Sequence, residues 1–201
     1  LGYDGRIKFK GSSLVSRSTE CFGRRFVREA VRLLLNEDIQ GLHDLYLAQR
    51  DRILAHDWND GVADFQRTET LKNTVEAYAA AVQAGRRTRT ASYELAKQRA
   101  AQTGQLPRKG DRMSYYLAGP GPAFEAARLA DAWDPAAPDE HTPYYLDRLD
   151  QVAAKFVPFF ETEHQHRLVF SPEDLFGFDA AGIRLARTER ALDDVEDDVP
   201  F

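Results

Sequence analysis

The sequence has little of several features that would identify a class of protein. A single cysteine, Cys21, excludes an internal disulfide and a cysteine-based metal site. Its apolar runs are too short to span a membrane, and no charged-then-apolar leader opens the chain. We therefore expect a cytoplasmic domain.

Catalytic motifs are also missing from the sequence. There is no Gly-rich phosphate loop, no Gly-x-Ser-x-Gly elbow and no HExxH pairing among the five histidines. His164 and His166 lie beside Glu161 and Glu163, which could hold a metal, but a polar helix end is the favoured interpretation because metal ligands need supporting partners. The sequence therefore predicts no catalytic residue, no metal site and no cofactor in this chain.

The sequence contains enough hydrophobic residues to form a core, and its charged residues are unevenly distributed along the chain. Of its 201 residues, 43% are hydrophobic and 11% aromatic, enough for a folded domain, and the net charge is −5. Residues 161–201 hold four arginines against eleven acidic residues. Residues 1–32 and 86–112 each hold eight basic residues, against three and two acidic ones. These basic segments are compatible with a polyanion-binding face, and the alternative is ordinary solvated surface charge.

The beginning of the chain is abrupt. It does not start with Met, and Asp4-Gly5, a hairpin turn signal, comes almost at once. Residues 5–10 then alternate apolar and basic side chains, as in a half-buried strand. We expect a piece of a larger protein that enters in the middle of a hairpin.

Periodicity and capping signals predict a mainly α fold with a few short β-strands, α+β overall. Thr142-Pro143 is a typical helix start, Gly104 a typical helix end, and Ser18 or Thr19 could cap the first helix. Helices are expected over 19–35, 39–55, 70–83, 91–102 and 142–157, a strand over 112–117 and an extended stretch over 62–66.

Five motifs in order resemble the end of family B DNA polymerases. Residues 8–17 look like the Lys-x-Lys-Gly…Arg segment that opens the thumb of that family. Residues 71–78 and 90–96 resemble two thumb helices. Residues 110–117 are similar to the Gly-Asp-Arg-Ile-x-Tyr-Tyr strand, and residues 143–149 to the Tyr-Tyr-Leu helix.

The resemblance points to one branch of the family, and the sequence differs from the family's pattern at two places. Residues 157–160 continue like bacterial DNA polymerase II. The Arg-Arg-Asp that often follows Lys-Gly is reduced to Ser16-Arg17-Ser18, and Pro-His-Val is replaced by residues 87–90.

The resemblance implies a helical thumb-type bundle with short strands at its base. Residues 1–12 would end the palm hairpin, 13–160 would form the thumb, and 161–201 would be an extension with an acidic, flexible end. The catalytic carboxylates of the palm, and the Mg²⁺ that a polymerase uses, would lie outside this chain. The fragment alone would not polymerise, and its partners would be primer–template DNA and the palm.

A thumb must grip DNA of any sequence, which calls for phosphate contacts rather than base readout. The predicted contacts are basic or hydroxyl side chains at the base and in the loops: Lys8, Lys10, Ser12, Arg17, Arg86, Arg87, Arg89, Lys109 and Arg112. Asp111 is expected to have a structural turn role. Tyr115, Tyr116, Tyr144 and Tyr145 are expected to be core residues with anchored hydroxyls.

Two alternatives stay open. Residues 174–178 loosely resemble the Leu-Phe peptides with which bacterial polymerases dock on the sliding clamp, so Leu175, Phe176 and Phe178 could bind a clamp; otherwise these aromatics fold back onto the thumb. The whole chain could instead be a non-enzymatic helical module whose basic patches contact a protein.

Overall fold

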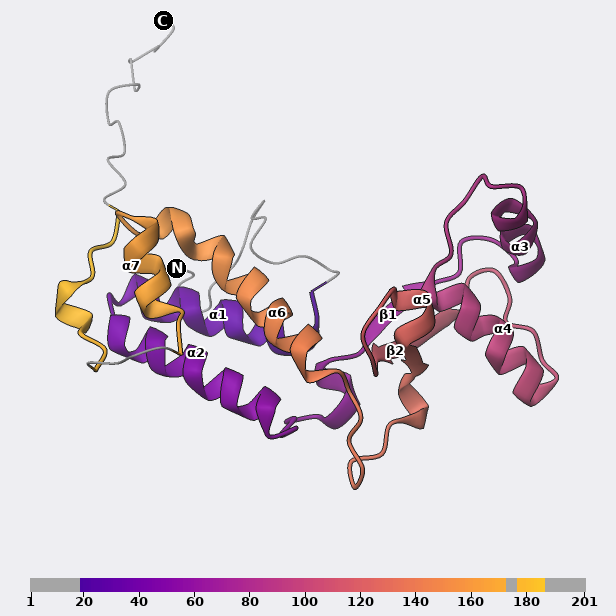
Figure 1. Cartoon of the computed structure of the whole chain (residues 1–201), viewed down its shortest axis with the longest axis horizontal. Coiled ribbons are helices and arrows are strands. Elements are labelled where there is room, and N and C mark those ends of the chain that lie inside the picture. The colour runs from indigo at the N-terminus through magenta and orange to yellow at the C-terminus, as the bar shows by residue number, and fades with distance from the viewer. Residues whose placement is uncertain (1–18, 173–176, 187–201) are drawn as a thin grey trace, which may run out of the picture.

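The computed structural model describes residues 19–172 and 177–186, arranged as two lobes (Figure 1). The helical lobe contains α1 (Cys21–Leu35), α2 (Ile39–Leu54), α6 (Thr142–Ala153) and α7 (Glu163–Val169). The sheet lobe contains β1 (Arg67–Thr70), β2 (Arg112–Leu117), β3 (Ala127–Leu129), α3 (Val75–Gln83), α4 (Ala91–Thr103) and α5 (Ala123–Ala126). Short 3₁₀ turns are η1 (Gly61–Asp64), η2 (Ala130–Ala132), η3 (Ala154–Phe159) and η4 (Ala180–Gly182). The described residues include no helix long and apolar enough to cross a membrane.

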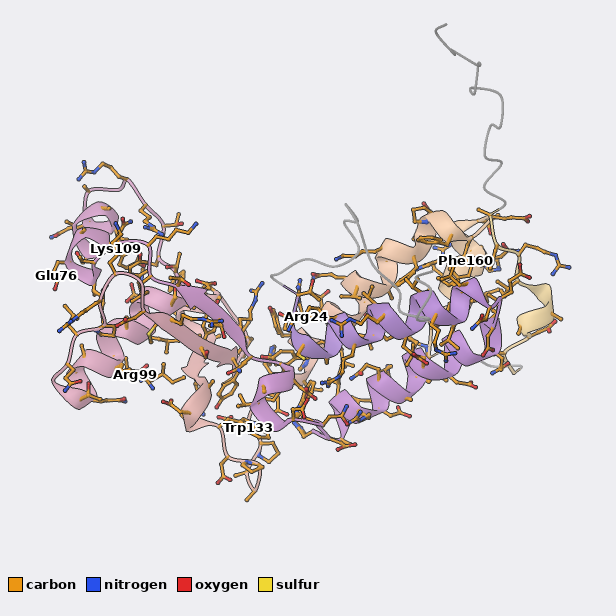
Figure 2. All side chains as sticks on the ribbon, turned by 180° about the vertical axis from the view of Figure 1, so that it is seen from behind. Arg24, Glu76, Arg99, Lys109, Trp133 and Phe160 are labelled. Carbon is orange, nitrogen blue, oxygen red and sulfur yellow. The ribbon has the colours of Figure 1, made fainter. Side chains whose placement is uncertain are left out.

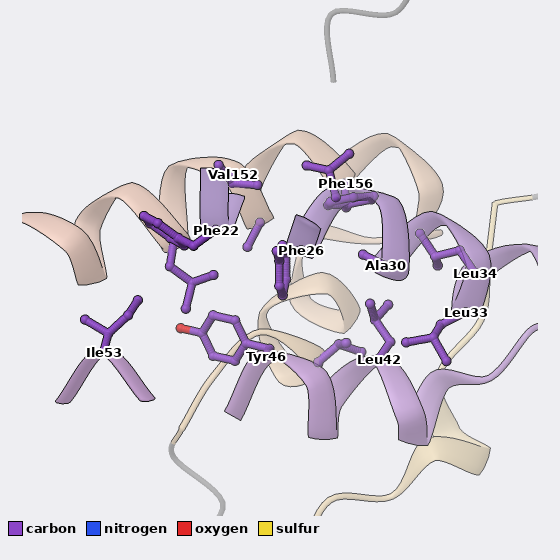
Figure 3. Close-up of a cluster of buried hydrophobic side chains, with 14 of the residues drawn as sticks. Phe22, Phe26, Ala30, Leu33, Leu34, Leu42, Tyr46, Ile53, Val152 and Phe156 are labelled. Atoms are coloured by element: carbon purple, nitrogen blue, oxygen red, sulfur yellow. The ribbon is translucent and has the colours of Figure 1, made fainter. Parts of the chain in front are cut away.

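The helical lobe forms around the apolar stripe of α1. Phe22, Phe26 and Ala30 recur at helical spacing and are almost fully buried (Figure 3). They pack against α2 and α6, whose Leu42 and Val152 are also buried (Figure 3). The core of this lobe is therefore a three-helix seam rich in aromatic rings.

The sheet lobe has three antiparallel strands in the order β1-β2-β3. The register places Thr68 opposite Ser114 and Tyr116 opposite Arg128. Since side chains alternate along a strand, β2 serves both cores. Tyr115 belongs to the cluster covered by α3 and α4, whereas Tyr116 points into the core of the helical lobe.

Two segments cross between the lobes, residues 55–66 and residues 130–141, and Glu140 ties them together. Its side chain is fully buried. Trp58 Nε1 donates to Oε1 at 2.6 Å, Trp133 Nε1 donates to Oε2 at 2.8 Å, and His56 Nδ1 lies 2.7 Å from Oε1. Burial alone would raise the pKa of Glu140, but these three hydrogen bonds outweigh it and hold the pKa below its usual value.

A second buried carboxylate, Glu20, lies at the start of α1. Arg148 of α6 donates to it from Nε and from a terminal nitrogen, both at 3.2 Å. Arg67 of β1 lies 3.5 Å from its other oxygen, which also accepts a 3.4 Å bond from the Tyr144 hydroxyl. Glu20 therefore joins the helical lobe to the edge strand of the sheet.

The mainly α fold with a small sheet is confirmed, and the strand over 112–117 and the Gly104 helix end are confirmed in place. The predicted start of the third helix at 70 is wrong. Residues 67–70 pair with β2 as β1, and the helix begins at Val75 after Thr74 caps it. Tertiary pairing here outweighs local periodicity.

Three further boundaries differ from those expected. The stretch 62–66 is not extended, because η1 occupies residues 61–64. The residue at the N-cap of the first helix is Glu20 rather than Thr19, and the Glu20 side chain is bound by Arg148 instead of capping the helix. The helix from Thr142 tightens into η3 at Ala154, where Pro158 lacks the N–H that an α-helix needs.

The helical lobe extends past residue 160. Val169 and Ile183 are buried in the same core as α1, and Phe160 forms a bridge with Leu185. Part of the predicted C-terminal extension thus packs with the bundle.

Removing the side-chain carboxylate of Glu140 should destabilise the whole fold. Glu140→Ala removes the acceptor of the buried Trp58 indole N–H and of the part-buried Trp133 indole N–H, and we expect it to lower the free energy of unfolding by about 3 kcal/mol. Urea denaturation followed by tryptophan fluorescence measures this. The exposed Glu161→Ala serves as the control and should change it by no more than about 0.5 kcal/mol. Equal losses in the two variants would contradict this role for Glu140.

Candidate nucleic-acid interface

Arg112 lies at the centre of a groove on the sheet lobe. Three adjoining depressions, of about 890, 270 and 310 Å³, are all lined by this arginine. Arg99 is shared by the first and third, and Gln66 by the second and third. We call this continuous surface the arginine groove. It extends from the loop at Leu106 to the lobe junction at Thr19.

The floor of the arginine groove presents hydroxyl groups from the open face of the sheet. Thr68 and Ser114 are directly opposite each other on β1 and β2, and their hydroxyl oxygens are 2.8 Å apart. Arg112 precedes Ser114 by two residues, so its exposed side chain leaves the same face. A guanidinium beside hydroxyl donors is a combination that binds phosphate oxygens.

Further arginines line the two ends of the groove. Arg24 stands at the lobe junction and donates to the Thr19 carbonyl at 2.6 Å, whereas Arg99 projects from α4 (Figure 2). Arg108 is exposed in the loop before β2. None of the three was singled out by sequence reasoning, although Arg24 lies in one basic segment and Arg99 and Arg108 in the other. Their positive charge could have marked them as candidate phosphate contacts, but nothing in the sequence showed that they share one surface with Arg112.

The acidic residues of the groove are all partnered. Glu20 is bound by Arg148 and Glu69 accepts from the Tyr115 hydroxyl at 2.6 Å. Asp111 accepts from the backbone N–H of Arg108 at 2.8 Å, which confirms its expected structural turn role. Asp131 pairs with Arg99 and offsets its charge.

The four predicted loop cations have different surroundings. The Arg87 guanidinium lies over the rings of Tyr78 and Tyr93, at 5.4 and 5.1 Å from their centres. Arg89 pairs with Glu94 and Glu125 and lies over Phe124. Arg86 and Lys109 are exposed. The structure thus uses Arg87 and Arg89 in packing the sheet lobe.

The remaining predicted DNA contacts, Lys8, Lys10, Ser12 and Arg17, lie outside the described residues, so they stay predictions. Of the five predicted contacts that the structure describes, Arg112 and Lys109 flank the turn at Asp111, and only Arg112 lines the groove.

Tyrosines hold the strand that carries Arg112. The hydroxyls of Tyr115 and Tyr116 donate to Glu69 and Asp139, and Tyr145 accepts from the N–H of Leu117 at 3.0 Å. Tyr144 reaches Glu20, as described above. Tyr115, Tyr116 and Tyr145 are confirmed as core residues with anchored hydroxyls, whereas Tyr144 is only partly buried.

The aromatic segment near the C-terminus lies in part within the described residues. Leu175 and Phe176 lie outside them, while Phe178 stacks on His43 with ring centres 4.0 Å apart. His43 in turn contacts the carbonyl of Val169 through Nδ1 at 2.8 Å. This position of Phe178 fits the alternative in which the segment folds back onto the bundle.

Of the two histidines considered as metal ligands, one is buried and the other is exposed. His166 is buried, with Nε2 2.9 Å from the carbonyl of Ala153, and burial lowers its pKa. His164 is exposed. His166 therefore has a core role, which differs from the polar helix end that the sequence favoured, and only the exposed His164 matches that interpretation.

The chain matches no known family model, and no curated protein matches it either. Its function must therefore be argued from its residues and from this geometry.

Removing the negative charge beside Arg99 should strengthen polyanion binding. Asp131→Asn frees the Arg99 guanidinium and removes one repulsive charge from the groove, so we expect duplex DNA to bind roughly threefold more tightly at low salt. Fluorescence anisotropy with a labelled duplex measures the change. The matched substitution Asp147→Asn on α6 should leave the affinity unchanged, and an equal gain from both would assign the effect to net charge alone.

Proposed function

We propose that this chain is the DNA-binding thumb fragment of a family B DNA polymerase, similar to bacterial DNA polymerase II. It grips primer–template duplex through sequence-independent phosphate contacts and is not catalytic alone, because the palm carboxylates lie outside it. The remainder of the polymerase is its partner, with the sliding clamp as a second candidate through residues 175–178.

The observation that carries this proposal is the position of Arg112. It stands in the motif over 110–117 that resembles the family's strand, and it is also the residue common to all three depressions of the arginine groove. A sequence motif and a surface feature that were identified separately therefore coincide at one side chain.

The chemistry of the groove favours phosphate over base contacts. Guanidiniums and hydroxyls line it together on the open face of the sheet, beside acidic groups that other residues engage. Such a surface contacts the backbone of a duplex and reads no sequence.

A second candidate function, the helical protein-interaction module, is favoured by an apolar surface on the other lobe. Leu35 and Phe159 are 57% and 41% exposed, and with Leu185 they line a small hollow at the end of α1. An apolar interface of this kind would be insensitive to salt, so the two functions can be separated by measurement.

The test is duplex binding at several salt concentrations. We expect log affinity to fall with log salt, with a slope of about −0.9 for each phosphate neutralised. Arg112→Ala should weaken binding to a blunt duplex and to a primer–template several-fold and reduce the slope by about one phosphate. Fluorescence anisotropy with two unrelated sequences checks both effects.

Arg167→Ala is the matched control, because Arg167 is an exposed arginine of α7 in the helical lobe. It should change neither the affinity nor the slope. Binding that ignores salt, or equal losses in the two variants, would contradict the groove as the DNA interface. Failure to bind at low salt would make the protein-interaction module the leading function.

A further inference from the structure

A further pocket of about 390 Å³ lies where α4 begins, and Glu69 lines both this pocket and the arginine groove. Its basic side chains are Lys72 and Arg87, and the hydroxyl residues that line it are Thr70, Thr90, Ser92 and Tyr93. Thr90 is the N-cap residue of α4, a helix of 13 residues. The first N–H groups of a helix point out of its end and carry a partial positive charge, which favours an anion.

The hydroxyls of Thr90 and Ser92 have no hydrogen-bond partner among the described residues, and that of Thr90 is buried. Ser92 retains only 3% of its surface, and Thr90 Oγ1 is shielded from solvent. Thr90 does not make the usual capping bond to the first turn of α4. Among the described residues no hydrogen bond to either hydroxyl is formed. Buried polar groups normally have partners, so two open hydroxyls in one pocket point to a ligand that supplies acceptors.

The cations are placed to complete such a site. The Arg87 guanidinium lies over the rings of Tyr78 and Tyr93. When the side-chain amide of Asn73 is oriented with its oxygen toward Arg87, that oxygen accepts a hydrogen bond from the guanidinium at 3.0 Å. Lys72 is exposed at the rim. The helix end and the two side chains therefore all bring positive charge to this pocket.

The acidic groups around the pocket are engaged by other partners, and the two basic side chains that line it outnumber its one carboxylate. Glu69 lines it but accepts a hydrogen bond from Tyr115. Glu94, one turn along α4, pairs with Lys97 and Arg89, and its pKa is lowered: burial opposes this, but the bonds from Lys97, Arg89 and Tyr78 outweigh it. The pocket itself therefore keeps an excess of positive charge.

We propose that this pocket binds a phosphate-type oxyanion. The N–H groups of Ala91, Ser92 and Tyr93 and the hydroxyls of Thr90 and Ser92 would donate to its oxygens, with Arg87 and Lys72 balancing its charge. The oxyanion can come from a nucleic-acid backbone or from a free phosphate or phosphate ester. The inference does not depend on the proposed function, because a free anion would fill the same donors.

The test is a titration of the ¹⁵N-labelled chain with inorganic phosphate, against chloride at the same ionic strength. The amide signals of residues 91–93 should shift and saturate with phosphate only. Thr90→Val with Ser92→Ala removes both hydroxyl donors and should weaken binding about tenfold. Since Thr90 makes no capping bond, this variant should keep its fold, which the remaining amide signals report.

Two further variants complete the test. Lys72→Gln removes one exposed charge without disturbing the core and should weaken phosphate binding severalfold. Thr88→Val is the matched control, because Thr88 is exposed in the same loop and does not line the pocket; it should bind phosphate as the unaltered chain does.

Duplex DNA distinguishes the sources of the oxyanion. If the double variant also loses duplex affinity, the pocket holds a backbone phosphate, whereas unchanged duplex affinity with weakened phosphate binding assigns it to a free phosphate or ester. Shifts that chloride reproduces, or equal phosphate affinity in the double variant and the unaltered chain, would overturn the site. Because phosphate alone is the first probe, a failure of duplex binding would leave this result unaffected.

Discussion

The structure depends on two carboxylates that are buried where its lobes meet. A buried carboxylate is costly unless it is fully paired, so Glu20 and Glu140 require their partners to be in place. Those partners come from both lobes and from both crossing segments: Arg67 and Arg148 for Glu20, and the indoles of Trp58 and Trp133 for Glu140. Satisfying the two carboxylates therefore fixes how the sheet lobe sits on the helical lobe.

The consequence for function is a preformed groove. β2 contributes Tyr116 to one core and Tyr115 to the other, and its end is held by Tyr145 and by the N–H of His141. The backbone of Arg112, at the start of the same strand, is held by its pairing with β1. A cationic surface that is already ordered has less conformational entropy to lose when a polyanion binds.

Charge partners divide the basic residues of the chain into two groups. Arg87 and Arg89 lie over aromatic rings, and Arg89 also pairs with Glu94 and Glu125, so both contribute to the packing of the sheet lobe. Arg108 and Arg112 are exposed along the groove. This division explains how a chain with a net charge of −5 can present a basic face, since the acidic residues that lie near the groove are engaged by other groups.

The sequence by itself determined the elements whose signals are local. The stripe of Phe22, Phe26 and Ala30 sets α1, and Gly104 ends α4, because periodicity and a left-handed φ are properties of neighbouring residues. It also marked Arg112 through its motif. Only the tertiary structure decided that residues 67–70 form a strand, since β1 exists by pairing with β2, forty residues away. The same holds for the groove and the pocket at α4. Arg24 and Arg99 come together with Arg112 through packing, and an unpartnered hydroxyl is visible only when every possible partner has been placed.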